Sequence, residues 1–408
     1  MLIPYISSFL VGFSYSFLLY NKIAFGISMI LGTVLLMIHK KSFTLRVFEH
    51  KKELNLVLVF LIISFFISCV LSIKIERSVP VIIYFFIFLL LSSNLSRCFN
   101  LDEKIFKRTL FFLSISAIIN LLYVLIYNLY HSGILTGDFF EINFSDTEGE
   151  FFLYEIKKFK GYMNIFSVLV LLIPFFRNSL NYFVLILFLL PTLILSNSNS
   201  PILGIILGLV LCGFLFLYKK TKKPRIFVSG VFILFIILAS LIVKNLPSKL
   251  ESESLMNYDF KIPISIIDAH RQFVWAFSIT QIKEKPLFGF GPDTSNFIEG
   301  SQEIIGNYYT GTMEFMPSHP HNFIFELILE IGIFGTLIFF IFLILINIRI
   351  FKKCNMKQKY VLIFFNGYFW GASLVNFSFW LEWWQGSYFF ILAIIYSKIN
   401  FDKLKDNS

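Results

Sequence analysis

The sequence predicts an all-α integral membrane protein with about twelve transmembrane helices. Of the 408 residues, 57% are hydrophobic and only 15% are charged, whereas about 25% of the residues of a soluble globular protein are charged. The mean hydropathy is +0.77. Apolar runs of about 16 to 25 residues recur along the chain, and this is the length that a helix needs to cross a bilayer.

The apolar runs extend over the whole chain, so residues 1–408 are expected to form a single polytopic membrane domain without a soluble one. The first run has no basic segment before it and no evident cleavage site, which favours a retained anchor over a removed signal peptide. The predicted spans are residues 3–20, 23–38, 54–73, 78–95, 109–130, 162–176, 180–196, 201–218, 226–243, 322–347, 360–379 and 384–397.

Basic residues give the orientation of these spans. The loops after the even-numbered spans and the C-terminal tail hold the larger share of Lys and Arg, as in the run KKTKKPR at residues 219–225. Short basic loops belong in the cytoplasm, together with both termini. The net charge of +10 therefore reflects loops that flank membrane spans and does not indicate a nucleic-acid partner.

Two long segments are expected on the opposite, extracytoplasmic side. One is an acidic loop at about residues 131–161, and the other is a large loop at about residues 244–321 that contains short helices. Long loops on a membrane bundle commonly carry its function. None of the four cysteines falls in these loops and none has metal-ligand spacing, so neither a disulfide nor a metal site is expected.

The large loop contains a predicted helix over residues 268–283, which Asp268 can cap. Arg271 and Trp275 are four residues apart and share a face of this helix. Periodicity alone allows an equal alternative, an interfacial helix whose aromatic side chains rest among lipid headgroups. A turn rich in Gly and Pro follows at residues 285–292, and its GxG lacks the strand and helix that a dinucleotide site needs.

The segment PSHPHN at residues 317–322 leads into the tenth span. Because Pro320 suits a first helical turn, the helix is expected to begin near His321 with its N-terminus facing outward. Free N–H groups and the positive end of the dipole favour an anion there. The same field favours a neutral His321, which can accept a proton. Considered alone, His321 has the alternative interpretation of an amphipathic residue at the headgroup level.

Three polar residues continue into that span. Asn322, Glu326 and Glu330 are spaced by four and lie along one helix face. Carboxylates inside a span usually face the protein interior. Glu330 is therefore expected to hold helices together or to orient the site.

These residues form a pattern. His321-Asn322, nine residues, Gly332, two residues and Gly335 resembles the signature of the O-antigen ligase family, which belongs to a wider group with O-antigen polymerases and bacterial O-linked oligosaccharyltransferases. The run from Arg271 and Trp275 to PLFGFG at residues 286–291 is similar to a second pattern of this group.

Two further stretches bear on this resemblance. Gly161-Tyr-Met-Asn164 is similar to a short segment that opens a mid-chain helix in the group. The stretch SNSNS at residues 196–200 departs from the family, because Asn199 stands where an arginine is common. That cationic phosphate contact is therefore either missing or replaced by Lys160 or another basic loop residue.

The resemblance implies a GT-C-like enzyme of the bacterial inner (cytoplasmic) membrane whose active site faces the periplasm. Its donor would be a glycan on undecaprenyl diphosphate, and its acceptor a sugar hydroxyl of lipid A–core in lipopolysaccharide synthesis. The transfer would invert the anomeric centre and would need no metal and no cofactor. Arg271 would grip the diphosphate and His321 would take the acceptor proton. The implied substrate-binding residues are His319, Asn322, Trp275, Lys160, Asn164 and Glu330.

Three other functions stay open. An O-antigen polymerase would join the same donor to another lipid-linked repeat unit, and one sequence does not show the choice of acceptor. A transporter or flippase would place charges near mid-membrane, whereas the predicted spans contain no Lys or Arg and only Glu326 and Glu330 as carboxylates. A structural membrane scaffold would tolerate the loss of His321 or Arg271.

Overall fold

The computed structural model describes residues 2–45, 47, 52–132, 134, 158–176, 182–221, 224–247, 259–308 and 311–406. Most of the predicted loop at 131–161 therefore lies outside the described residues, as does part of the loop at 244–321.

The described strands are β1 (Ile304–Tyr308) and β2 (Gly311–Glu314), which pair antiparallel. The helices are α1 (Leu2–Gly12), α2 (Ser14–Leu18), α3 (Lys22–Lys40), α4 (Lys52–Val70), α5 (Ile75–Leu101), α6 (Glu103–His131), α8 (Met163–Phe176), α9 (Tyr182–Leu195), α10 (Asn199–Lys220), α11 (Pro224–Lys244), α12 (Ala269–Glu284), α13 (Phe323–Lys353), α14 (Met356–Ser373) and α15 (Glu382–Asp406).

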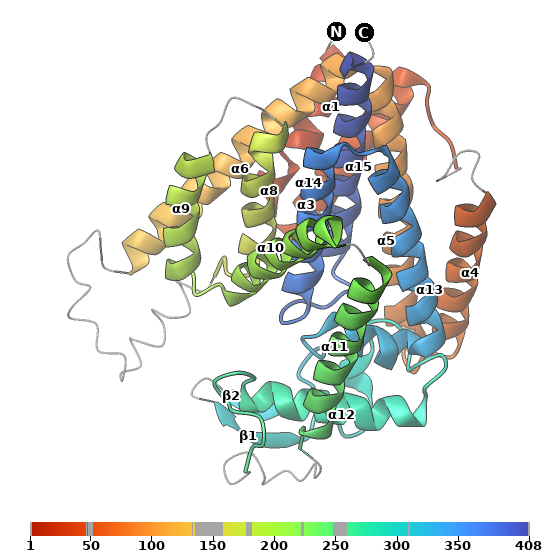
Figure 1. Ribbon diagram of the computed structural model, residues 1–408, viewed down its shortest axis with the longest axis vertical. Helices are drawn as coiled ribbons and strands as arrows, with labels where there is room; N and C mark the ends of the chain where they lie inside the picture. The colour runs from red at the N-terminus through yellow and green to blue at the C-terminus, as the bar shows by residue number, and fades with distance from the viewer. Residues whose placement is uncertain are drawn as a thin grey trace.

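The apolar helices form a bundle, and the chain termini lie together at one end of it (Figure 1). At the opposite end, α12 lies across the bundle beside the β1–β2 hairpin. Six of the described helices are long and apolar enough to cross a membrane, namely α3, α4, α5, α6, α10 and α13. The prediction of an all-α polytopic membrane protein is thus confirmed, whereas the number of twelve spans stays a prediction.

Helix α13 differs from the prediction of one continuous span over residues 322–347. Gly332 has φ 70° and ψ 175°, which is not helical, and divides α13 into residues 323–331 and 333–353. The ring centroids of Phe323 and Phe340 lie 6.1 Å apart. In one straight helix these two residues would be separated by about 25 Å along the axis. The chain therefore folds back at Gly332, and the prediction of a single continuous helix is wrong.

The glycine-rich turn after α12 explains why the break occurs there. The N–H of Phe290 donates to the carbonyl of Leu329 (3.0 Å), and the N–H of Gly291 donates to the carbonyl of Glu330 (2.9 Å). A Cβ on Gly332 would lie 2.1 Å from the carbonyl oxygen of Leu287. The left-handed φ and this close approach both require glycine at 332. The two predicted motifs, at 286–291 and 321–335, thus pack together through their backbones.

A second hydrophobic cluster lies beneath α12, apart from the core of the bundle. The predicted helix over 268–283 is α12, and the side chain of Asp268 accepts from the N–H of Arg271 (2.9 Å) as its cap. Phe273 and Phe277 are buried against Phe315, which follows β2. The aromatic side chains of α12 therefore pack inside the protein, which differs from the headgroup alternative.

Candidate active site

His319 and His321 lie side by side, with ring centroids 4.2 Å apart. Both rings bind the carbonyl oxygen of Asn376: Nε2 of His319 lies 3.0 Å from it, and Nδ1 of His321 lies 3.1 Å from it. A carbonyl oxygen only accepts hydrogen bonds, so each of these nitrogens carries a proton. Nδ1 of His319 lies 2.9 Å from Oγ of Ser318 and accepts from it. Nε2 of neutral His321 then holds the lone pair that can accept a proton.

The surroundings keep both imidazoles neutral. Burial, together with the repulsion from a charged His321, lowers the pKa of His319 from 6.5 to about 3. Burial also lowers the pKa of His321 below 6.5, and the positive charge of Arg271 acts in the same direction. The hydrogen bond to Asn376 opposes these effects without reversing them. The predicted neutral state of His321 thus has burial as its main cause.

Helix α12, which carries Arg271 and Trp275, contacts residues 317–322, the histidine segment. Nε1 of Trp275 donates to the carbonyl oxygen of Pro320 (3.0 Å), and its ring lies 5.6 Å from that of Phe325. Nε of Arg271 lies 3.2 Å from Oδ2 of Asp268 in a partly exposed ion pair. The start of α12 therefore lies against the histidine segment, and Arg271 is close enough for its charge to act on the His321 imidazole. The catalytic role of the two residues stays a prediction.

The backbone at His321 is strained. Its φ is 52°, in the left-handed region that residues other than glycine rarely adopt. Such outliers cost on the order of 1 kcal/mol and cluster at functional sites. Asn322 follows as the helix cap: its Oδ1 accepts from the N–H groups of Ile324 (3.0 Å) and Phe325 (3.3 Å). The helix begins at Phe323, so Pro320 precedes the cap and does not occupy the first turn.

The two stretches with Gly161 and Ser196 also reach this region. Nδ2 of Asn376 donates to Oγ of Ser200 in the first turn of α10 (3.0 Å). Oγ of Ser198 donates to the carbonyl oxygen of Lys160 (3.3 Å). The side chain of Asn199 is exposed at the start of α10. The stretch 196–200 and the main chain of Lys160 therefore lie beside the segment that binds both histidines.

Asn164 supports the start of α8 from within. Its side chain is fully buried, and Nδ2 donates to the carbonyl oxygen of Gly161 (2.9 Å). The hydroxyl of Tyr368 donates to the main-chain carbonyl of Asn164 (2.7 Å). Gly161 lies directly against the ring of Phe377, which a Cβ would approach to 2.9 Å. The start of α8 is thus packed against Phe377, which lies one residue after Asn376 in the connection between α14 and α15.

The buried carboxylate of Glu330 accepts hydrogen bonds from residues 293–295, directly after the glycine-rich turn that follows α12. Its Oε2 accepts from the N–H of Asp293 (2.7 Å) and from Nε1 of Trp380. Its Oε1 accepts from the N–H groups of Thr294 (3.1 Å) and Ser295 (2.9 Å), and from Oγ of Ser295 (2.5 Å). Protein donors therefore surround both oxygens, so Glu330 holds the turn after α12 against α13. Its predicted part in substrate binding stays a prediction.

Glu326 binds the connection between α14 and α15. Its Oε1 accepts from Oγ of Ser378 (2.5 Å), and its Oε2 accepts from the N–H of Phe379 (2.7 Å). Sequence reasoning missed this connection, residues 374–381. This connection contacts the site mostly through main-chain groups, above all the carbonyl of Asn376. Every residue type has these main-chain groups, so the sequence gives no sign of such contacts.

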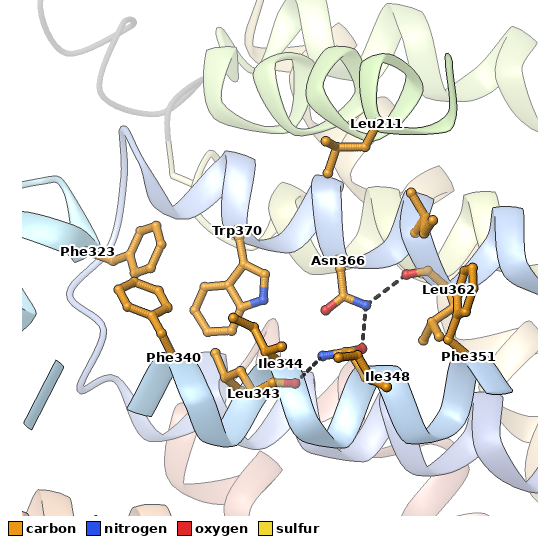
Figure 2. Close-up of a pocket in the computed structure, with 12 residues that line it drawn as sticks. Leu211, Phe323, Phe340, Leu343, Ile344, Ile348, Phe351, Leu362, Asn366 and Trp370 are labelled. Carbon is orange, nitrogen blue, oxygen red and sulfur yellow. Dashed lines mark hydrogen bonds between the residues drawn. The ribbon is translucent and has the colours of Figure 1, made fainter. Parts of the chain in front are cut away.

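An apolar groove of about 380 Å³ lies between α10, α13 and α14. Figure 2 shows Phe323, Phe340 and Trp370 at one end of it and Phe351 and Leu362 at the other. Phe323 is two residues from His321, so the candidate site and the groove are adjacent. The remaining lining residues are Leu211, Leu343, Ile344, Asn347, Ile348, Ile363 and Asn366.

The two asparagines of the groove have their polar atoms paired. Nδ2 of Asn366 donates to Oδ1 of Asn347 (2.8 Å), and Nδ2 of Asn347 donates to the hydroxyl of Tyr388 (3.0 Å). That hydroxyl donates to Oδ1 of Asn366 (2.8 Å) and closes a ring of three hydrogen bonds. The groove thus presents a mainly apolar wall, which suits a hydrocarbon chain. In the described part of the chain, no three His, Cys, Asp or Glu side chains group as metal ligands.

Fold and site together define a multi-pass membrane protein with a neutral histidine two residues from the end of an apolar groove, and with an arginine whose charge acts on that histidine. Residues 183–340 match the family model described as O-antigen ligase. A protein of Rickettsia felis named "Putative polysaccharide ligase" is 27% identical over 348 residues, which cover 84% of this chain and 80% of that protein. A relative in Rickettsia conorii, of the same description, is 27% identical over 345 residues, 84% of this chain and 79% of its own. The resemblance to the O-antigen ligase family is confirmed, and it supports an enzyme with an O-antigen ligase-like function.

Proposed function

We propose that this protein transfers a glycan from undecaprenyl diphosphate to a sugar hydroxyl of lipid A–core, on the periplasmic face of the bacterial inner membrane. The family match supports the reaction class. The observation that carries the proposal is the position of His321, in the same region as Arg271 and next to one end of the apolar groove. The three parts correspond to the base, the phosphate contact and the lipid site that such a transfer needs.

Nε2 of His321 is the proposed general base. It takes the proton of the acceptor hydroxyl, whose oxygen then bonds to the anomeric carbon. The bond from that carbon to the diphosphate oxygen breaks on the opposite side, and its electron pair leaves with the diphosphate. The anomeric centre is therefore inverted. Arg271 stabilises the charge that grows on the leaving group, because a guanidinium can grip phosphate oxygens in bidentate fashion.

The groove is the proposed site of the polyprenyl chain. Its walls are aromatic and aliphatic, and Phe323 at one end leads to the histidine segment. A chain that lies there would place its diphosphate near Arg271 and the start of α10. Lys160 and Asn199 are kept in the proposal as diphosphate neighbours, because their segments meet beside Asn376. In this proposal His319, Asn322, Trp275, Asn164 and Glu330 hold the site in shape.

The test is reconstitution of the purified protein in liposomes with a lipid-linked glycan and two competing acceptors, lipid A–core and a second lipid-linked repeat unit. The expected product is glycosylated lipid A–core from the wild type and none from His321→Ala. His39→Ala is the matched control, since His39 is exposed in the last turn of α3. A product on the repeat unit would identify a polymerase. Movement of the lipid-linked glycan across the bilayer without any transfer would identify a flippase.

A further inference from the structure

The main-chain carbonyl of Asn376 is the shared acceptor for two histidines that come from another part of the chain. It binds Nδ1 of His321 and Nε2 of His319 at once. The side chain of Asn376 reaches the other way, where Nδ2 donates to Oγ of the buried Ser200 on α10. One residue therefore joins the histidine segment to the start of α10.

We propose that Asn376 is a positioning residue that holds His321 in the tautomer with Nδ1 protonated and Nε2 free to act as the base. This inference rests on the proposed function, because it deepens the role given to His321. In a neutral imidazole either nitrogen can carry the proton, and the acceptor beside one nitrogen selects between them. A carbonyl 3.1 Å from Nδ1 makes that selection.

The carbonyl can select a tautomer only if it is itself fixed, and two elements fix it. On one side Ser200 holds the Asn376 side chain. On the other side Glu326 accepts from Ser378 and from the N–H of Phe379, two and three residues further along. The connection is thus tied to α10 and to the 323–331 segment of α13, whose cap Asn322 directly follows His321.

The same carbonyl oxygen also explains why His319 is a neutral hydrogen-bond donor. Nε2 of His319 uses the other lone pair of the carbonyl, so both imidazoles are neutral donors to one oxygen. A protonated His319 with its ring 4.2 Å away would repel a proton on His321. The other charged or titratable groups that act on His321 are Arg271, His270 and Asp268, all at the start of α12. The shared carbonyl therefore keeps the neighbour of the base uncharged.

The test uses the full-length protein in liposomes with the lipid-linked glycan and lipid A–core. Asn376→Ala removes the bond to Ser200, and a kcat reduced at least tenfold is expected with little change in the KM for the donor. Ser200→Ala should lower kcat in the same sense by removing the partner. Asn400→Ala is the control, because Asn400 contacts Asn100 at an exposed site on α15. A change in KM alone would overturn the inference, as would an unchanged kcat in both variants.

Asn376→Asp gives a second readout, because it keeps an acceptor for Ser200 and adds a negative charge to the residue whose carbonyl binds both histidines. The hydroxyl of Ser200 can rotate to donate to the carboxylate, so the fold is retained. The new negative charge favours protonated imidazoles, and the acid limb of the kcat/KM profile should move to higher pH. An unmoved limb in a folded, active variant would overturn the inference.

A measurement independent of catalysis separates this inference from the proposed function. Nitrogen-15 NMR of labelled histidines distinguishes the two neutral tautomers, with His321→Gln to assign the signal. The expected state of His321 in the wild type is protonated at Nδ1, and in Asn376→Ala it should become a mixture. An Nε2-protonated wild type would refute the positioning role even if transfer occurs. The expected tautomer in a protein that transfers no glycan would instead refute only the proposed function.

Discussion

Replacement of Glu330 by glutamine tests how the turn after α12 is held. The side chain of Glu330 is 1% exposed and accepts five hydrogen bonds on its two oxygens. Glutamine has the same shape but only one acceptor oxygen, and its amide group is a donor. Whichever way the amide lies, two or three buried donors face an N–H instead of an oxygen.

The magnitude follows from those donors. A buried donor without a partner costs about 1 to 3 kcal/mol. If the amide nitrogen replaces Oε2, the N–H of Asp293 and Nε1 of Trp380 lose their acceptor. Two lost bonds give a destabilisation of about 2 to 6 kcal/mol. The turn also packs against Gly332, so its loosening should lower glycan transfer as well as stability.

The assay is the midpoint of thermal unfolding in detergent, with transfer measured on the same preparations. Glu330→Gln should unfold several degrees below the wild type. Glu299→Gln is the matched control, because Glu299 is exposed in the same loop. An unfolding midpoint equal to that of the wild type would show that the five donors do not depend on the second carboxylate oxygen.

Four further outcomes are expected. His321→Ala should lower kcat by about 100- to 10,000-fold, as the loss of a general base does, while its unfolding midpoint stays within a degree or two of the wild type. Arg271→Lys should lower kcat/KM at least tenfold in the transfer assay, because an ammonium lacks the guanidinium fork. Transfer should persist below pH 6.5 and fall only as the pH drops through the lowered pKa of His321, since the protonated ring cannot accept a proton; an acid limb above pH 6.5 would contradict this sign. Gly332→Ala should yield little folded protein on size-exclusion chromatography, because its Cβ would meet the backbone of Leu287.

The free energy of unfolding should also decrease as the pH falls, as glycan transfer is expected to do. The unfolded chain binds a proton at each of these histidines near pH 6.5, whereas the folded pKa of His319 lies at about 3 and that of His321 is also lowered. The unfolded state therefore binds more protons between the two values, and stability falls as the pH drops below about 6.5.

Hydropathy predicted most helices because membrane helices are long, apolar and continuous. The helix after Asp268 was predicted from its cap and its aromatic spacing, and α12 begins one residue later. The approach of α12 to the histidine segment was expected from a resemblance, and the structure accounts for it by the bond from Trp275 to the carbonyl of Pro320.

Two features were beyond the reach of sequence reasoning for physical reasons. The segment from 322 to 347 is apolar throughout, so hydropathy does not reveal that it turns back at Gly332. The turn depends on a contact with the backbone of Leu287, which lies far away in the sequence. The role of Asn376 was missed because its carbonyl binds the histidines, and every residue has a carbonyl.

The fold-back at Gly332 gives a physical reason for the spacing between His321 and the glycines of its motif. The 323–331 segment runs back along the second segment of α13 until Phe323 lies beside Phe340 and the ring of Trp370, 5.1 Å away. A straight α13 would carry His321 about 25 Å or more from that position. The reversal instead sets the imidazole next to the end of the apolar groove. A base that serves a lipid-linked donor has to meet the diphosphate close to where the lipid chain ends, and the break at Gly332 brings His321 to that place.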